Sequence, residues 1–377
     1  MVYRQVIVLI KRTFLLLVLL LLCCCNTSFA KETPTISAAS AVLYDPLSDT
    51  ILFEKDAFTV RGMASTTKIM TAIIALERYD LAQIVSIRPQ WCGIEGSSMY
   101  LKPEEQITVL DLLYGLLLSS GNDAAVALAG FYPGGEADFV AEMNLKATEL
   151  DLGNTHFDNP SGLDGETHYT TACDLAKLTA YCMKNDTFAE IVQTKSKEVA
   201  GRVLSNHNRL LGEIGASGVK TGFTKACGRC LVSAKEENGR LLICVTLNAP
   251  NDWEDHKRLY AFGFSQYSPY DVLGAGDCGS CALISSEKPS SRLYCNESFS
   301  LWLTQQEREQ MTTVLCGPRF LYGSVFAGEQ YGTLQIRLKE HILFETPVYF
   351  AQTSQETEQK ISLFTVLKNY LFRRREP

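Results

Sequence analysis

The sequence has little positive charge, because its 35 lysine and arginine residues are outnumbered by 42 aspartates and glutamates. A net charge of −7 is unfavourable for a surface that binds phosphate backbones, so nucleic acid is not expected as a partner. The chain also lacks internal repeats and low-complexity tracts, which argues against a repeat protein. What remains is a globular composition over 377 residues, enough for two or three domains and a core that holds a pocket.

Long hydrophobic runs are scarce as well, and the most prominent one is FLLLVLLLLCCC near the N-terminus. Three basic residues precede it, and the small residues Ser28 and Ala30 follow it, so residues 1–30 are predicted to be a secretory signal peptide. The run is shorter than the roughly 20 residues of a membrane span, which makes an uncleaved anchor the weaker alternative. Cleavage would remove three positive charges and make the mature chain more acidic.

Histidine is rare, and none of the five lies close to the two cysteine pairs with CxxC spacing, Cys227 with Cys230 and Cys278 with Cys281. Four thiolates could bind zinc, but the two pairs lie on segments of different character. Buried free thiols or disulfides are therefore favoured over a zinc site. Ten of the thirteen cysteines lie beyond the signal peptide, an even number that could pair in an oxidising compartment.

The hydrophobic pattern predicts an α/β (α+β) sandwich. Two short apolar runs around DPLSD predict a hairpin over about 36–56, and helical periodicity dominates from 65 to about 194. Strands return as a meander over 215–250, where Asn238-Gly239 is typical of a tight hairpin turn, and another helix follows. We therefore expect an antiparallel sheet that combines strands from both ends of this region and packs against a helical region.

The composition then changes and predicts two further parts. Past Tyr270 the chain has short β-like runs without a strong helical period, so 31–269 is expected to form the sandwich and 270–355 a smaller β-rich domain. In the tail, 356–377, apolar residues share one helical face ahead of three arginines. Such a segment could lie in a membrane surface; the alternative is an ordinary helix packed on the β-rich domain.

Ser65 and Lys68 stand three residues apart at the start of the apolar stretch IMTAIIAL. On a helix this spacing puts both side chains on one face, and burial would lower the pKa of the lysine enough for it to take the serine proton. Three other Ser-x-x-Lys pairs occur in the chain, but we expect only this one to open a buried helix. The alternative is a serine N-cap followed by a lysine that reaches solvent.

Ser120-Gly121-Asn122 separates two apolar helical stretches. From a rigid turn that faces Ser65, Ser120 could relay a proton and Asn122 could hydrogen-bond the peptide of a substrate. A glycine that ends one helix, with Asn122 or Asp123 capping the next, would explain the same residues without chemistry.

Lys220-Thr221-Gly222-Phe223 falls on a predicted edge strand. There the lysine and the hydroxyl could hold a substrate carboxylate, while glycine lets the substrate backbone approach as an added strand. The alternative is an exposed strand lysine beside a threonine without a special role.

In this order, the SxxK, SxN and KTG elements resemble the signatures of penicillin-binding proteins and class A β-lactamases. The longer stretches MASTTKIMTA, SSGNDAAVALA, NPSGLD…HYTTACDLA, KTGFTKACGRCLVSA and VTLNAPNDWEDHKRL are similar to the low-molecular-weight D-alanyl-D-alanine carboxypeptidases. The resemblance is strong over about 36–268 and loose over the β-rich part. The tail resembles the family only in its general type. Ser161, where the family often has histidine, and Cys227, where alanine is more usual, depart from the pattern.

The resemblance implies a serine-type carboxypeptidase that removes the terminal D-alanine from peptidoglycan stem peptides and is trapped covalently by β-lactams. Ser65 would form the acyl-enzyme, Lys68 would take its proton, and Ser120 would help return the proton to the leaving D-alanine. The enzyme would be exported and would act at the outer face of the cytoplasmic membrane or in the cell wall.

The same resemblance implies the substrate contacts. Asn122 would orient the substrate amide, Lys220 and Thr221 would bind the terminal carboxylate, and Gly222 would belong to the same strand motif. The backbone N–H groups of Ser65 and Phe223 would form the oxyanion hole. No metal or organic cofactor is implied.

Two other functions remain as alternatives. Class A β-lactamases use a loop glutamate in an ExxxN context, but neither Asn154 nor Asn159 is preceded by glutamate at that spacing, and Glu166 has Thr170 four residues on. A non-catalytic cell-wall scaffold on the same fold is expected to have lost the nucleophile or the base, and here both are present.

Overall fold

The computed structural model describes residues 33–355, so the predicted signal peptide (1–30) and the predicted amphipathic tail (356–377) lie outside the described residues. Within the described range, residues 36–355 belong to one unit, to which the description below applies. Across 33–355, no helix combines the length and the apolar character that crossing a membrane requires.

A five-stranded antiparallel sheet, in the order β2-β1-β9-β8-β7, forms the centre of the first part of this unit. Its first two strands are the predicted hairpin, and β1 pairs with β9, so the sheet does combine distant segments as expected. Asn238 and Gly239 connect β8 to β9 with φ angles of 53° and 72°, the left-handed geometry that tight hairpin turns require. The strands are β1 (Ser40–Asp45), β2 (Thr50–Lys55), β7 (Val219–Thr224), β8 (Gly228–Glu237) and β9 (Arg240–Leu247).

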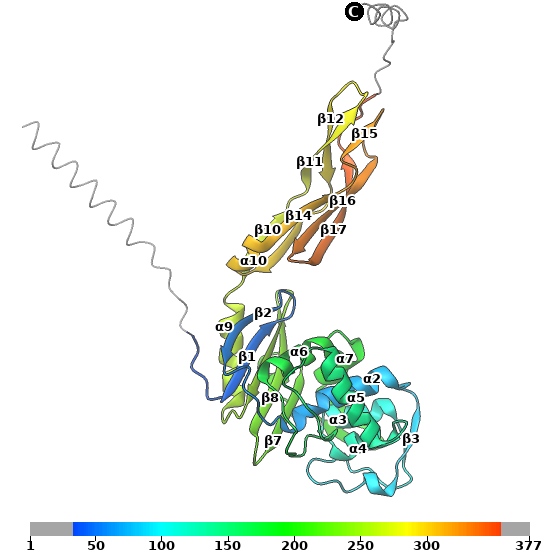
Figure 1. Ribbon diagram of the computed structural model, residues 1–377, viewed down its shortest axis with the longest axis vertical. Helices are drawn as coiled ribbons and strands as arrows, with labels where there is room; N and C mark the ends of the chain where they lie inside the picture. The colour runs from blue at the N-terminus through cyan, green and yellow to red at the C-terminus, as the bar shows by residue number, and fades with distance from the viewer. Residues whose placement is uncertain (1–32, 356–377) are drawn as a thin grey trace, which may run out of the picture. The chain divides into compact units, whose positions relative to one another are not determined.

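Both faces of this sheet are covered, which makes the predicted sandwich (Figure 1). On β1, Val42 points into the core of the helical region, whereas Leu43 points into a second core beneath α9 (Asp252–Phe264). On β9, Val245 and Cys244 divide in the same way. This period of two is expected for a strand that is buried on both sides.

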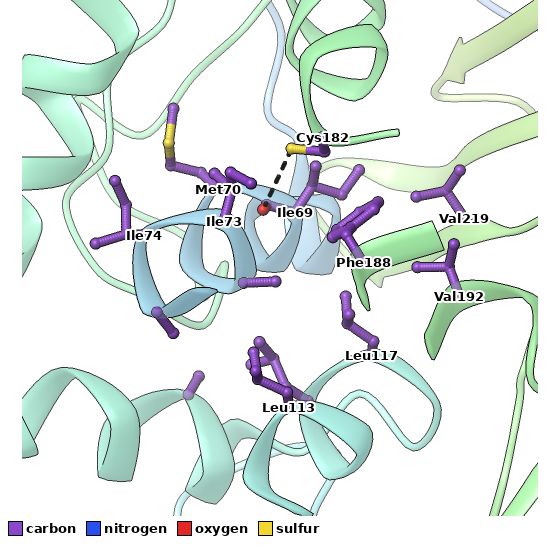
Figure 2. Packing of buried hydrophobic residues seen from close by; sticks show 14 of the residues in the cluster. Ile69, Met70, Ile73, Ile74, Leu113, Leu117, Cys182, Phe188, Val192 and Val219 are labelled. Atoms are coloured by element: carbon purple, nitrogen blue, oxygen red, sulfur yellow. Dashed lines mark hydrogen bonds between the residues drawn. The ribbon is translucent and has the colours of Figure 1, made fainter. Parts of the chain in front are cut away.

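The helical region is organised around α2 (Lys68–Arg78), in which every residue from Lys68 to Ala75 is buried. Figure 2 shows the apolar side chains of α2 enclosed by side chains from α3, α6, α7 and β7. The expectation of a central, dry helix is therefore confirmed. The other helices are α3 (Val109–Leu117), α4 (Asn122–Phe131), α5 (Glu136–Glu149), α6 (Ala172–Cys182) and α7 (Asp186–Gln193).

Short elements lie at the start of the predicted helical stretch (65 to about 194), within it, and between its end and β7. Strands of three residues are too short to show a clear alternation, and β3 with β4 is such a pair. These elements are η1 (Ala64–Thr67), β3 (Ile84–Ser86), η2 (Pro89–Trp91), β4 (Gln106–Thr108), β5 (Ser196–Val199), β6 (Arg202–Ser205) and α8 (Leu210–Glu213).

The C-terminal part is rich in β-structure, as expected. It contains a six-stranded sheet, in the order β14-β16-β17-β12-β11-β15, and the pair β10–β13. Sequence reasoning missed the helix α10 (Gln305–Gln310), although TQQE carries the signature of a capping box between Thr304 and Glu307. The strands are β10 (Ser268–Leu273), β11 (Gly276–Ile284), β12 (Ser290–Cys295), β13 (Phe299–Leu303), β14 (Met311–Cys316), β15 (Phe320–Tyr322), β16 (Gln330–Leu338) and β17 (His341–Phe350).

Candidate active site

Ser65 lies inside the short 3-10 helix η1, directly before α2. Met63 precedes η1 and Thr67 precedes α2, and neither side chain caps its helix. Thr67 instead donates its hydroxyl to the carbonyl of Ala64 at 2.8 Å. The alternative of Ser65 as an N-cap is therefore wrong, and its hydroxyl is not engaged in holding the helix start.

The amine of Lys68 is fully buried beneath this serine. Its Nζ lies 3.0 Å from Ser65 Oγ, 2.6 Å from Asn122 Oδ1 and 2.5 Å from the carbonyl oxygen of Ser161. The alternative of a lysine that reaches solvent is thus wrong. The structure brings the predicted nucleophile and the predicted proton acceptor into hydrogen-bond distance.

Burial lowers the pKa of Lys68 well below its ordinary value, and the nearby charge of Lys220 lowers it further, against an opposing effect of Asp123. A neutral amine keeps two N–H donors and one lone pair. The oxygens of Asn122 and Ser161 can accept the two N–H groups, which leaves the lone pair for the hydroxyl of Ser65. This arrangement suits an amine that accepts a proton.

The second predicted element lies beside this pair, at the start of α4. Ser120 is buried and has a φ angle of 58°, so the chain turns sharply there. Asn122 is the first residue of the helix, and its Nδ2 donates to the carbonyl of Glu95 at 2.5 Å while its Oδ1 accepts from Lys68. Its carboxamide is thereby fixed by two different segments of the chain.

Asp123 has another role than capping α4. The residue before this helix is Gly121, which has no capping side chain, so the alternative of a cap by Asn122 or Asp123 is wrong. The carboxylate of Asp123 accepts from the backbone N–H groups of Met99 and Leu101, each at 3.0 Å. It therefore holds the segment beside the site in place.

The KTG element lies on β7, which is an edge strand as predicted. Lys220 is 1% exposed, and burial lowers its pKa to about 7. The alternative of an exposed strand lysine is wrong, because its Nζ donates internally to the carbonyl of Thr221 at 2.8 Å. Phe223, two residues after Thr221 on the strand, is 63% exposed.

Gly222 is needed for a reason that the sequence did not indicate. A Cβ atom there would lie 3.0 Å from the backbone nitrogen of Ser65 and 3.1 Å from that of Thr66. We predicted that glycine lets a substrate backbone approach; the structure shows that it lets β7 approach η1. The strand motif and the serine are therefore in direct backbone contact.

The loop over 158–171 contributes contacts that sequence reasoning missed. The side-chain oxygen of Asn159 accepts the N–H groups of Ser161 and Gly162, which fixes the turn whose carbonyl contacts Lys68. Gly162 has a φ angle of 86°, and a Cβ atom there would lie 2.1 Å from the carbonyl of Ala64. The stretch NPSGLD contributed to the family resemblance, but no signal in it indicated these partners.

A buried histidine of the same loop supports η1. His168 Nε2 lies 2.7 Å from Thr67 Oγ1, and burial lowers the pKa of His168 to about 4. Its ring is therefore neutral at physiological pH and acts here as a hydrogen-bonding partner.

A cavity of about 320 Å³ opens over the site. Five of the eight predicted site residues line it, whereas Lys68, Asn122 and Lys220 lie buried behind its wall. The other five lining residues were not among the predicted site residues. The lining consists of Ser65, Ser97, Ser120, His207, Thr221, Gly222, Phe223, Arg229, Asp252 and Trp253.

The ten cysteines within 33–355 are free thiols, and this range contains no group of three or more histidine, cysteine or acidic residues placed to hold a metal ion. The two members of the first CxxC pair have different partners. Cys227 Sγ lies 3.3 Å from a carboxylate oxygen of Asp164, whereas Cys230 Sγ lies 3.9 Å from the carbonyl of Gly62.

The chain is similar to known proteins of one family. A family model described as D-alanyl-D-alanine carboxypeptidase matches residues 27–251. The chain is 30% identical over 349 residues to D-alanyl-D-alanine carboxypeptidase DacF of Bacillus subtilis, with 88% of each protein covered. It is 28% identical over 362 residues to D-alanyl-D-alanine carboxypeptidase DacD of Salmonella typhimurium, with 91% of this chain and 92% of the relative covered.

Solved structures of similar fold cover the same regions. Penicillin-binding protein 5 from Haemophilus influenzae matches with a TM-score of 0.63 and 25% identity over 86% of this chain and 99% of that one. The Streptomyces K15 DD-transpeptidase matches with a TM-score of 0.60 and 35% identity over 62% of this chain and 99% of that one.

Proposed function

The chain belongs to peptidase family S11, the D-alanyl-D-alanine carboxypeptidases, and we propose that the eight predicted site residues act together in catalysis and substrate binding. It is a low-molecular-weight penicillin-binding protein and a serine-type D-Ala-D-Ala carboxypeptidase of the cell wall. The observation that carries the proposal is the hydrogen-bond distance of 3.0 Å between Ser65 Oγ and the buried amine of Lys68.

In the acylation step, Ser65 Oγ attacks the carbonyl of the terminal D-Ala-D-Ala bond while Lys68 takes its proton. The low pKa that burial gives Lys68 supports this role, because a protonated amine cannot accept the proton. Ser120, which lines the same cavity, returns the proton to the nitrogen of the leaving D-alanine. Water then hydrolyses the ester on Ser65 and releases the shortened peptide.

The remaining groups bind and orient the substrate. Lys220 and Thr221 hold the terminal carboxylate, and Asn122 orients the substrate amide from its fixed position beside Lys68. The oxyanion that forms during attack is stabilised by the backbone N–H groups of Ser65 and Phe223. The close approach of Gly222 to the Ser65 nitrogen supports this pairing, since it brings the β7 backbone next to the serine.

The experiment measures D-alanine release by the mature chain from a peptide that ends in Lys-D-Ala-D-Ala. The variant Ser65→Ala should release none and should lose covalent labelling by a fluorescent penicillin. Ser196→Ala, at an exposed position of β5, is the matched control and should retain both. Equal release by Ser65→Ala would show that the nucleophile is another residue.

The same assay separates the two alternative functions. Rapid hydrolysis of the penicillin, with fast recovery of Ser65, would indicate a β-lactamase. Absence of both release and labelling in the unsubstituted chain would indicate a non-catalytic scaffold.

The parts of the chain receive roles in the same proposal. The segment 1–30 exports the enzyme, 31–269 carries catalysis, 270–355 forms a separate β-rich domain, and 356–377 associates with the outer face of the cytoplasmic membrane. The apolar and basic composition of the two end segments supports this assignment. Cell fractionation of the full chain and of a Leu367→Glu variant tests the membrane contact, because a charge on the apolar face should release the enzyme from the membrane fraction.

A further inference from the structure

One outward face of the C-terminal sheet is apolar where a solvated face is expected to be polar. In the parallel pair formed by β11 and the edge strand β15, Ile284 lies directly beside Tyr322. The alternating residues Leu283 and Leu321 point into or pack against the buried core of this sheet. Side chains at the positions between them, including Phe320, therefore face outward.

Three of these strand residues and Phe326, which follows β15 in the chain, form what we call the β15 patch: Ile284, Phe320, Tyr322 and Phe326. Their exposed fractions are 39%, 49%, 70% and 58% respectively. The rings of Phe320 and Tyr322 contact each other edge to face, with centroids 5.7 Å apart. A single exposed apolar residue is ordinary, but three aromatic residues and an isoleucine at one end of a sheet are characteristic of a docking surface.

Phe326 lies at the same end of the sheet as Ile284. It follows Val325, which pairs with Ser354, and Ser354 Oγ lies 2.7 Å from Ser286 Oγ, two residues after Ile284. In Figure 1, β12 and β15 lie at the same end of the C-terminal sheet.

The chain leaves the described region at this same end. The carbonyl of Gln355, the last described residue, accepts the backbone N–H of Glu287 and the hydroxyl of Ser286, both at 2.9 Å. The sequence continues directly into 356–377, with its apolar residues and three arginines. The last described residue before the tail therefore contacts Ser286 and Glu287, which lie two and three residues after Ile284 in the sequence.

We propose that the β15 patch docks on the surface of a lipid bilayer, as a second contact beside the tail. This rests on the proposed membrane association of 356–377. Tyr is favoured at the boundary between headgroups and acyl chains, because its apolar ring can enter it while the hydroxyl stays hydrated. Phe contributes apolar surface that can be buried at the same boundary. Arg319 directly precedes Phe320, and Lys288 lies four residues after Ile284; both are exposed and can face anionic headgroups. Two contacts bind a membrane more firmly than one amphipathic segment.

The test uses the mature full chain and vesicles of phosphatidylethanolamine and phosphatidylglycerol that contain brominated acyl chains. Tyr322→Trp places a fluorescent reporter in the patch, and the signal of the three native tryptophans is subtracted with the unsubstituted chain. Brominated lipid should quench the new tryptophan and shift its emission to the blue. Phe58→Trp, at a position that is 59% exposed and lies outside the patch, is the matched control and should show neither effect.

A second arm measures affinity. The double variant Phe320→Ser, Tyr322→Ser should bind the same vesicles about three- to tenfold more weakly, while its penicillin labelling and melting temperature stay close to those of the unsubstituted chain. Co-sedimentation of the chain without quenching at position 322 would overturn the patch and leave the tail contact in place.

The other outcomes are equally decisive. Failure of the unsubstituted chain to sediment with vesicles would overturn both contacts. A blue shift at position 322 that depends on protein concentration and needs no vesicles would show that the patch joins two copies of the chain instead. In either case the carboxypeptidase activity is unaffected, so it is judged separately.

Discussion

Lys68 and Arg240 are both buried basic residues, but their neighbours carry different charges. Arg240, on β9, forms ion pairs with Asp45 and Glu307, and its guanidinium lies 4.9 Å from the ring centroid of Tyr267. Burial alone would lower its pKa, yet Asp45 and Glu307 hold the pKa of Arg240 above its ordinary value. This cation stays charged and links a strand of the first sheet to α10 in the C-terminal part.

Lys68 has oxygen partners of a different kind. The side chain of Asn122, the backbone of Ser161 and the hydroxyl of Ser65 are all neutral. Hydrogen bonding satisfies the amine without compensating a positive charge, so burial keeps the pKa of Lys68 low. The difference shows that similar burial produces a structural ion pair or a proton acceptor, depending on the charge of the partners.

Replacing the proton acceptor by a permanent cation should have the largest effect. In Lys68→Arg the guanidinium stays protonated, so the rate of penicillin labelling should fall by about 10²–10⁴-fold. Lys146→Arg is the control, because Lys146 is also largely buried but pairs with Glu77 and Glu149. Its labelling rate should be unchanged. Undiminished labelling in Lys68→Arg would remove Lys68 from the proposed mechanism.

Removing the compensated cation should instead affect stability. Arg240→Met leaves Asp45 and Glu307 buried without their partner, which should cost about 3–5 kcal/mol in the free energy of unfolding. Labelling per folded molecule should stay the same, since Arg240 does not touch the site. Arg78→Met breaks a more exposed pair with Glu142 and should cost less than about 1 kcal/mol. Denaturant titrations of both variants measure the difference, and equal costs would contradict the comparison.

The sequence predicts those features of the active site that depend on local spacing. Three residues on a helix place Ser65 and Lys68 on one face, and the position of KTG in a meander predicts the edge strand β7. The pairing of Arg240 could not be predicted, because Asp45 and Glu307 are far from it in sequence and no local pattern links them.

The contact between Lys68 and Ser161 was hidden for a further reason. It spans 93 residues and uses a backbone carbonyl, for which no side-chain signature exists. Gly222 was predicted to let a substrate backbone approach, but only the tertiary structure shows that a side chain there would collide with the backbone nitrogen of Ser65. Helix and strand periods encode local neighbours, whereas these contacts depend on how loops pack.

A single substitution should give Lys68 a charged partner, as Arg240 has. Asn122→Asp places a carboxylate where Oδ1 now lies 2.6 Å from Lys68 Nζ, and this should raise the pKa of Lys68. The neutral amine is the active form, so activity is present above its pKa and is lost as pH falls through it. Raising the pKa therefore moves the acid limb of the labelling rate to higher pH and slows labelling at neutral pH by about 10- to 100-fold.

Asn122→Ala is the matched control for this shift. It removes the same carboxamide from the substrate and from Lys68 but adds no charge. Its labelling rate should fall at every pH, with the acid limb close to its original position. An equal displacement of the limb in both variants would mean that the charge of the partner does not set the behaviour of Lys68.

Substitutions of Lys220 should have the smallest effect on activity. Lys220 is buried like Lys68, but it must be charged to hold a carboxylate. Its pKa of about 7 means that the charged form is present below that pH and is lost as pH rises through it. Above neutrality, kcat/KM should thus fall by about tenfold per pH unit. Lys220→Arg, which stays charged, should remove this alkaline limb. Lys220→Gln should also move the acid limb to higher pH, because the charge of Lys220 helps keep the pKa of Lys68 low.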